Sequence, residues 1–180
     1  MTLAKLVIPR WFSAAVIVAA LLARFLPHPW NLTPVGSMFL FCGFAAVGLR
    51  GFVLPLAGYA LSDVALNTLV YHTPFGTPSL WVWAAFFVAW LIGRALRKYS
   101  AAWAIYPAAV LSAVSFFAIS NFGSWILSYP HTLAGLLAAY TAALPFFQPT
   151  LLGDLVYSTL FFGLAYALNG APRQALAPPA

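Results

Sequence analysis

Long apolar stretches, separated by short clusters of proline, glycine, histidine and basic residues, run along almost the whole chain. A bilayer core of about 30 Å takes about 20 apolar residues of helix, so most of these stretches are long enough to cross it or nearly so. Proline marks several of their ends, because it lacks the N–H that a helix interior needs. The pattern predicts six transmembrane helices, at residues 11–26, 34–49, 52–70, 80–96, 101–120 and 150–168.

The segment between the fifth and sixth stretches has a different pattern. Residues 131–145 are typical of a short helix that spans about 22 Å, which is too short for a crossing. We expect an interfacial or re-entrant helix there, with non-helical backbone at 121–125 and 128–130; a seventh span is the alternative. Irregular backbone at membrane depth persists only where it is buried in protein or lines a cavity.

Composition supports a membrane protein. The chain has 180 residues, of which 64% are hydrophobic and 6% are charged, and its mean hydropathy is +0.95. Soluble domains carry about 25% charged residues. We therefore expect an all-α integral membrane protein, with one six-helix domain at residues 1–170 and a disordered cytoplasmic tail at 171–180. The basic N-terminus resembles a signal peptide, but a second apolar stretch follows closely after the first, which favours a retained first helix.

Basic residues predict the orientation. If the N-terminus is cytoplasmic, seven of the eight Lys and Arg face the cytoplasm and only Arg24 does not, so both termini are expected inside. The net charge of +6 is spread over the ends of the apolar stretches and forms no basic, aromatic-interleaved patch, which excludes a nucleic-acid partner.

This orientation gathers the other polar side chains at the outer side. Arg24, Asp63 and Asp154 are the ionisable residues within predicted spans, where each costs about 2.5–3.5 kcal/mol. They are interpreted as a cluster that holds three helices together, as the floor of a ligand pocket, or as both, since one arginine cannot neutralise two aspartates. Further candidates would stack on a ligand or hydrogen-bond to it: His28, Asn31, Asn121, Trp125, Tyr129, His131 and Tyr140.

Motifs for catalysis and metal binding are absent from the sequence. It contains no HExxH, GxSxG, P-loop or CxxC pattern. The three histidines lie far apart, and Cys42 lies within an apolar stretch, where a small buried residue is favoured over a soft metal ligand. We expect no enzyme activity, no cofactor and no metal.

A stripe of small residues marks the first predicted span. Ala15, Ala19 and Ala23 recur every four residues, a spacing that lets helices approach closely. The stripe would pack inside the bundle or against a partner membrane protein.

Several segments together resemble a known family. They are residues 24–34 (RFLPHPWNLTP), 61–63 (LSD), 121–125 (NFGSW), 129–136 (YPHTLAGL), 143–147 (ALPFF) and 153–154 (GD). In order and spacing they resemble an uncharacterised bacterial membrane family, the domain of unknown function 6580, over about residues 24–163. The resemblance implies the bacterial inner membrane and no established activity.

The predicted architecture is also similar to that of the substrate-binding (S) subunits of energy-coupling-factor transporters. That likeness implies capture of a vitamin-like nutrient from outside and contact with an energising module through the alanine stripe. We therefore expect a membrane substrate-binding or transport subunit. The alternative is a structural or assembly protein of the bacterial envelope that binds no ligand.

Overall fold

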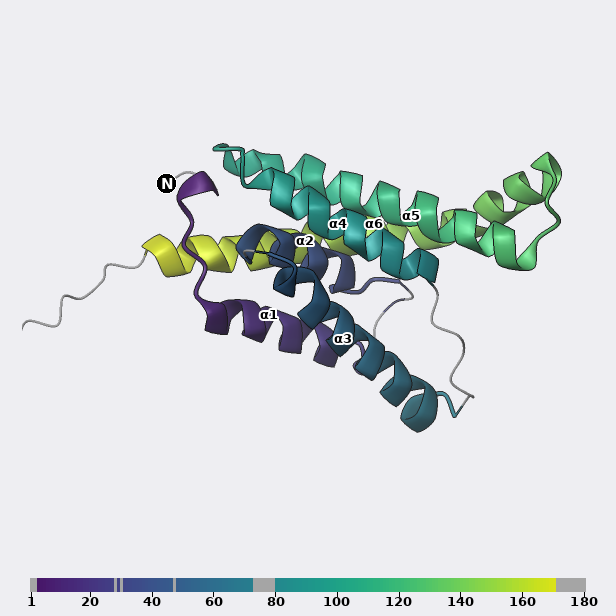
Figure 1. Ribbon diagram of the computed structural model, residues 1–180, viewed down its shortest axis with the longest axis horizontal. Helices are drawn as coiled ribbons and strands as arrows, with labels where there is room; N and C mark the ends of the chain where they lie inside the picture. Colours follow the sequence, from purple (N-terminus) through teal and green to yellow (C-terminus); the bar gives the residue numbers. More distant parts are fainter. Residues whose placement is uncertain (1–2, 28, 30, 47, 73–79, 171–180) are drawn as a thin grey trace, which may run out of the picture.

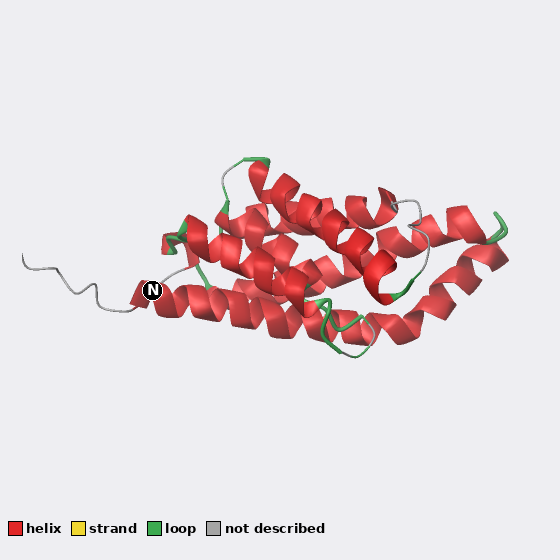
Figure 2. Ribbon diagram, turned by 90° about the horizontal axis from the view of Figure 1, so that it is seen from below, coloured by secondary structure: helices red, strands yellow, loops and turns green. Residues whose placement is uncertain are grey.

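The computed structural model describes residues 3–27, 29, 31–46, 48–72 and 80–170. All regular structure in this part of the chain is helical, as predicted (Figure 2). The six α-helices are α1 (Arg10–Ala23), α2 (Val35–Ala45), α3 (Arg50–Ala65), α4 (Leu80–Leu96), α5 (Ile105–Ser128) and α6 (Leu133–Gly170). Two short 3₁₀ turns, η1 (Leu3–Lys5) and η3 (Ala102–Ala104), precede α1 and α5, and a π-helical turn, η2 (Leu66–Val70), extends α3.

Three of the helical stretches are long and apolar enough to cross a bilayer. They are Arg50–Val70 with 21 residues, Ala102–Ser128 with 27 and Leu133–Gly170 with 38. The other helices, α1, α2 and α4, are apolar but have 14, 11 and 17 residues. At about 1.5 Å per residue, α2 spans only about 17 Å. The fold is thus all-helical and suited to a membrane, with fewer full-length spans than the six predicted.

Helix α2 lies at the centre of the molecule (Figure 1). Nine of its 11 residues are buried, and it contacts each of the other five helices. A helix that is apolar on every side belongs in a core. Cys42 lies on this helix and is 2% exposed, with its thiol free, which agrees with the expected small buried residue.

Two glycines allow α2 and α4 to touch backbone to backbone. A Cβ on Gly43 would lie 2.1 Å from the carbonyl oxygen of Trp90, and a Cβ on Gly93 would lie 2.0 Å from that of Leu40. Backbone carbonyls in packed helices cannot move aside cheaply, so these positions require glycine.

We expect Gly93→Ala to lower the free energy of unfolding by about 1–3 kcal/mol, because the added methyl group forces the two helices apart. The change would appear as a lower midpoint of thermal unfolding in detergent. Gly163→Ala on α6 is the control, because a Cβ there meets nothing within 4 Å, and it should be neutral or stabilise by up to about 1 kcal/mol. Equal losses in the two variants would contradict the close packing.

Helix α5 is longer than predicted. The expected end near residue 120, followed by non-helical backbone at 121–125, is wrong, since the helix continues to Ser128. The side chains of Ser120 and Asn121 donate to the carbonyls of Phe116 and Phe117, at 2.7 and 2.8 Å. Their polar groups are satisfied within the helix, so they do not interrupt it.

Helix α6 replaces the expected separate helix at 131–145. Neither an interfacial or re-entrant helix nor a separate seventh span is present there, because residues 133–170 form one helix of 38 residues. Thr132 caps its start by accepting a hydrogen bond from the Gly135 N–H at 3.1 Å. Pro145 and Pro149 lie inside the helix. A break in apolar surroundings would leave many backbone groups unpaired, so the chain bends instead (Figures 1 and 2).

The start of the chain, the α4–α5 turn and the end of α6 meet at one end of the molecule. The Leu3 N–H donates to the Ser100 carbonyl at 2.8 Å. The Asn169 side chain accepts from the Val7 N–H at 3.0 Å and donates to the Val7 carbonyl at 3.1 Å. Residues 171–180, predicted as a disordered tail, lie outside the described residues.

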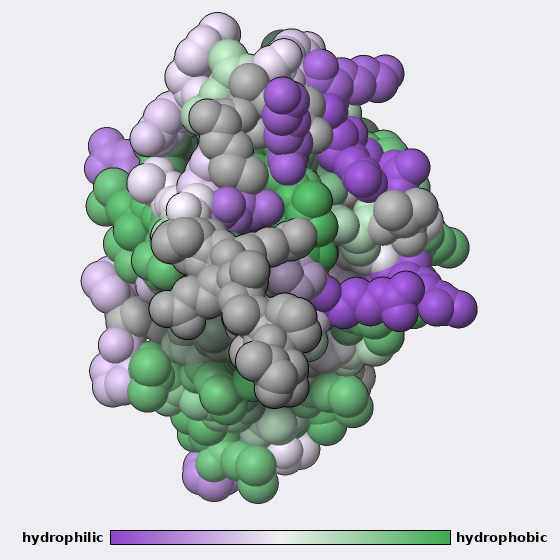
Figure 3. Space-filling view, turned by 90° about the vertical axis from the view of Figure 1, so that its left-hand side faces the viewer, coloured by the Kyte–Doolittle hydropathy of each residue, from purple (hydrophilic) through white to green (hydrophobic). Residues whose placement is uncertain are grey.

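Basic side chains gather toward this same end, where long hydrophilic side chains project from the surface (Figure 3). Arg97 donates to the Ala46 carbonyl at 3.4 Å, and Arg10 and Arg50 line one hollow beside it. These residues are exposed, and so are the other basic residues of this end: Lys5, Arg94 and Lys98. The basic side chains are therefore concentrated at one end of the molecule. The orientation of the molecule in a membrane stays a prediction.

Candidate ligand-binding cavity

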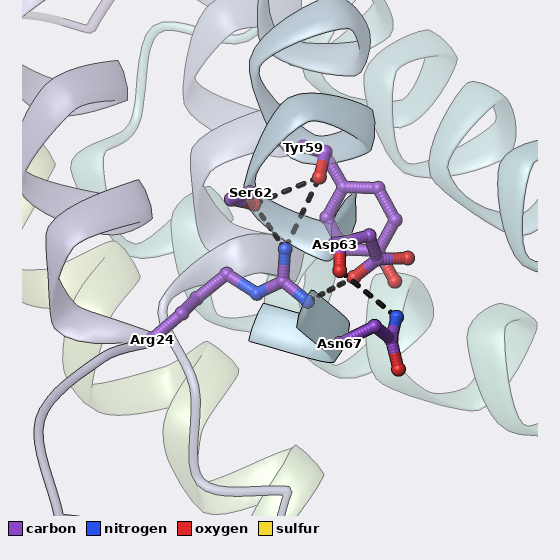
Figure 4. A network of polar contacts seen from close by, with 5 residues as sticks. All are labelled: Arg24, Tyr59, Ser62, Asp63 and Asn67. Carbon is purple, nitrogen blue, oxygen red and sulfur yellow. Dashed lines mark hydrogen bonds and ion pairs between the residues drawn. The ribbon is translucent and has the colours of Figure 1, made fainter. Parts of the chain in front are cut away.

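Arg24 organises a polar network between α1 and α3 (Figure 4). It follows α1 directly, as the C-cap, and its guanidinium forms an ion pair with Asp63. The guanidinium also donates to the Ser62 hydroxyl, and to the Tyr59 carbonyl at 3.2 Å. Its carbon Cζ lies 4.3 Å from the centroid of the Tyr59 ring. One arginine thus meets an anion, a hydroxyl, a carbonyl and an aromatic face.

Helical spacing explains how α3 supplies these partners. Positions 59, 62 and 63 are separated by three and four residues, so they lie on one face of the helix. The Ser62 hydroxyl donates to the Tyr59 carbonyl at 2.8 Å, and the Asn67 amide donates to the Asp63 carbonyl at 2.9 Å. The expected helix-pinning cluster is therefore present for Arg24 and Asp63.

Asp154 is not part of that ion pair. It is 2% exposed, on α6, and its carboxyl lies against the first turn of α2. A Cβ on Gly36 would lie 2.3 Å from the Asp154 oxygen Oδ1, so only glycine admits the carboxyl there. The Ser37 backbone N–H also interacts with the carboxyl. Asp154 thus stands at the positive end of the α2 dipole, where a negative charge is stabilised.

Buried hydroxyls surround this carboxyl. The Ser37 hydroxyl donates to the Asp154 carbonyl at 3.0 Å and lies 3.4 Å from Oδ1, and Ser158 donates to Ser37 at 3.1 Å. Ser112, on α5, faces the carboxyl but makes no hydrogen bond of ordinary geometry. Among the described residues, Asp154 makes no ion pair. A buried carboxyl is thus held by dipoles without a neutralising cation.

A cavity of about 190 Å³ extends from Arg24 to Asp154. All six helices, or the segments that follow them, contribute to its wall. The polar lining residues are Asn31, Thr33 and Thr150, and three aromatic rings complete it: Tyr59, Phe86 and Phe116. A more open hollow of about 690 Å³ adjoins it and shares Arg24, Asn31 and Thr33. The second volume lies within the range of ligand pockets, about 300–1,000 Å³.

The structure brings some of the predicted site residues to this cavity. Arg24, Asn31 and Asp154 line it, and Asp63 supports it through Arg24. Asn121 lines a smaller neighbouring hollow that also contains Asn31 and Thr150. His28 lies outside the described residues.

The predicted aromatic group lies elsewhere. Trp125, Tyr129 and His131 belong to the turn between α5 and α6 or flank it, at the end of the molecule opposite the termini (Figure 1). The Trp125 indole donates to the Pro130 carbonyl at 2.9 Å, and the His131 ring donates to the Ile126 carbonyl at 2.9 Å. The Tyr140 hydroxyl donates to the Ala118 carbonyl at 2.6 Å. None of these four side chains lines the cavity.

The alanine stripe faces outward. Ala15 and Ala19 are exposed and Ala23 is half-buried, whereas the buried face of α1 consists of Phe12, Val16 and Ala20. The stripe therefore does not pack inside the bundle and remains open to lipid or to another helix.

Sequence reasoning missed most of the cavity wall. The spacing of Tyr59 from Ser62 and Asp63 was a usable signal, since it places an aromatic ring on the polar face of α3. Ser37, Ser112 and Ser158 gave no such signal, because single serines in apolar helices are common and usually bond to their own backbone. Within the described part of the chain, no three His, Cys, Asp or Glu residues lie close enough to hold a metal ion.

Comparison with protein families gives one match. The model described as "Family of unknown function (DUF6580)" matches residues 6–176. No curated protein and no solved structure matches the chain.

Proposed function

The chain belongs to the family of unknown function DUF6580, and we propose that it is a membrane protein that binds a small solute from the extracytoplasmic side for transport. The observation that carries the proposal is the cavity between Arg24 and Asp154, because ionisable groups at membrane depth are costly and usually serve a ligand or ion path.

The cavity has features of a binding site. In a typical binding site, a few convergent polar groups in a mostly apolar wall fix the orientation of the ligand. Here these groups come from separate elements: Arg24 follows α1, Asn31 precedes α2, and Asp154 lies on α6. The adjoining hollow of about 690 Å³ would be the entrance. The predicted orientation directs this entrance away from the cytoplasm.

Energy for transport would come from a partner module or from a gradient, since the chain has no nucleotide-binding motif. The exposed alanines of α1 offer a face on which a partner helix could pack closely. This arrangement follows the likeness to energy-coupling-factor S subunits, and a vitamin-like nutrient is the ligand class that it implies.

A cavity-filling substitution tests the proposal. Thr150→Phe would place a ring in the cavity and should abolish ligand binding, measured as the thermal shift of purified protein against a vitamin panel. Thr159→Phe is the matched control. Both threonines donate to the carbonyl four residues earlier, at 2.8 and 2.7 Å, but Thr159 is exposed on the surface of α6.

Loss of every shift in Thr150→Phe, with shifts kept in Thr159→Phe and both variants folded, would support the cavity as the site. A panel that shifts neither the natural protein nor the variants, together with no small molecule that co-purifies, would count against a solute-binding function.

An envelope assembly protein is the second candidate, and the outward alanine stripe favours it. In that case Ala19→Leu should disrupt a complex seen by native electrophoresis of mild detergent extracts, while Thr150→Phe should have no effect on it. A solute-binding protein without a partner would form no such complex, and Thr150→Phe would abolish its ligand binding while Ala19→Leu would not.

A further inference from the structure

We propose that the cavity selects a small organic cation, a primary or secondary ammonium compound, with Asp154 as its counter-charge. The inference rests on the proposed function and specifies its substrate class. It follows from the charges that line the cavity, from the surroundings of the Asp154 carboxyl and from the aromatic wall.

The charges of the cavity do not balance. Arg24 and Asp154 are the charged residues among the described residues that line it. The charge of Arg24 is already matched by Asp63, with which it forms an ion pair. Asp154 has no such partner among the described residues, so its carboxylate, when ionised, is an unmatched negative charge at the cavity wall.

The protein places Asp154 beside dipoles and gives it no counter-charge. The first turn of α2, with the Ser37 hydroxyl and backbone N–H beside the carboxyl, directs the positive ends of its dipoles at this group. Ser112, 1% exposed and without a hydrogen bond of ordinary geometry, is a further polar group beside it. A cation in the cavity would complete this arrangement, since a carboxylate at membrane depth is costly until it is paired.

The aromatic wall suits the same ligand. Aromatic rings attract cations through their negative faces. Tyr59, Phe86 and Phe116 line the cavity, with ring centroids 4.9 Å apart for Tyr59 and Phe86 and 5.4 Å apart for Phe86 and Phe116. The guanidinium of Arg24 over the Tyr59 ring shows that a cation is accommodated at this wall.

Hydrogen-bond acceptors near the carboxylate complete the match to an ammonium group. The Thr150 hydroxyl donates its hydrogen to the Phe146 carbonyl at 2.8 Å, so its lone pairs can accept a hydrogen bond from a ligand. Asn31 and Thr33 supply further side-chain oxygens in the same wall. An anion would instead meet the Asp154 charge, and a neutral compound would leave it unpaired.

Three probes of one shape separate the charge classes: benzylamine, benzyl alcohol and benzoate. We expect the protein in nanodiscs at pH 7 to bind benzylamine at least about tenfold more tightly than the other two in calorimetric titrations. Asp154→Asn should remove this preference. Asp63→Asn should weaken it, because Arg24 then loses its partner and opposes Asp154, and the double variant should prefer benzoate.

Competition in the natural protein keeps the test valid if Asp154→Asn does not fold. Benzylamine should displace a bound panel compound and benzoate should not. The proposed class is overturned if benzoate or benzyl alcohol binds as tightly as benzylamine, or if none of the three binds at millimolar concentration. In either case, binding of a neutral or anionic panel compound that Thr150→Phe abolishes would leave the proposed function standing; absence of all binding would remove both.

Discussion

Arg24→Ala is expected to lower the free energy of unfolding by about 2–4 kcal/mol, a large share of the stability of a small protein. The substitution leaves Asp63 as an unpaired carboxylate within an apolar helix long enough to span a membrane, and it removes the guanidinium that joins α1 to α3. The Asp63 side chain is 33% exposed, so the loss should fall below that for a fully buried pair. Reversible unfolding in mixed micelles with increasing dodecyl sulfate would measure it.

The double variant Arg24→Ala, Asp63→Ala distinguishes pairing from packing. If the charge left on Asp63 causes most of the loss, the double variant should be more stable than Arg24→Ala alone. Arg97→Ala is the control, since Arg97 is exposed and makes one hydrogen bond of 3.4 Å, and it should change stability by about 0.5 kcal/mol or less. A double variant less stable than either single variant would assign the effect to lost packing.

Gly36→Ala should reduce ligand binding more strongly than any other single methyl group added to α2, with at least a tenfold loss as a rough expectation. The added Cβ would lie 2.3 and 2.8 Å from the two Asp154 carboxyl oxygens. These atoms are the end of a side chain, so the carboxyl would move and the backbone would stay. The cavity would then lose its charged wall while the helices remained packed, which a titration with benzylamine would detect.

Stability measurements separate this effect from a general defect. Gly36→Ala should unfold less easily than Gly93→Ala, whose Cβ would meet the backbone of α2, 2.0 Å from the Leu40 carbonyl oxygen. Full binding by a folded Gly36→Ala protein would show that the position of the Asp154 carboxyl does not matter for the ligand.

The helices could largely be predicted from the sequence, whereas the connection between the last two could not. Hydrocarbon selects for apolar stretches, and their ends near residues 26, 70 and 96 follow from nearby polar and breaker residues. The same rule failed at Pro145 and Pro149, which lie inside α6. A proline removes one backbone hydrogen bond, whereas a break in an apolar medium would leave several backbone groups unpaired. The sequence alone does not show which of these two costs is larger.

The site was predictable in its charges and not in its shape. Arg24, Asp63 and Asp154 were identified because ionisable groups are rare within spans, and the structure pairs the first two. Which aspartate lacks a basic partner depends on tertiary packing. Gly36 lets α2 pack directly against the Asp154 carboxyl, away from Arg24 and Asp63. The placement of Trp125 and His131 at the α5–α6 turn likewise depends on α5 continuing to Ser128.

The length of α6 has a consequence for the surrounding lipid. Its 38 residues would reach about 57 Å if straight, and the 27 residues of the α5 stretch about 40 Å, whereas the 21 residues of the α3 stretch match a core of about 30 Å. In a bilayer, the α5–α6 hairpin would therefore tilt strongly or extend into the headgroup region, where Trp125 and His131 would lie. Bilayers made from progressively longer acyl chains should enclose more of that hairpin, whereas the α3 stretch, which already matches a core of about 30 Å, would be too short for them.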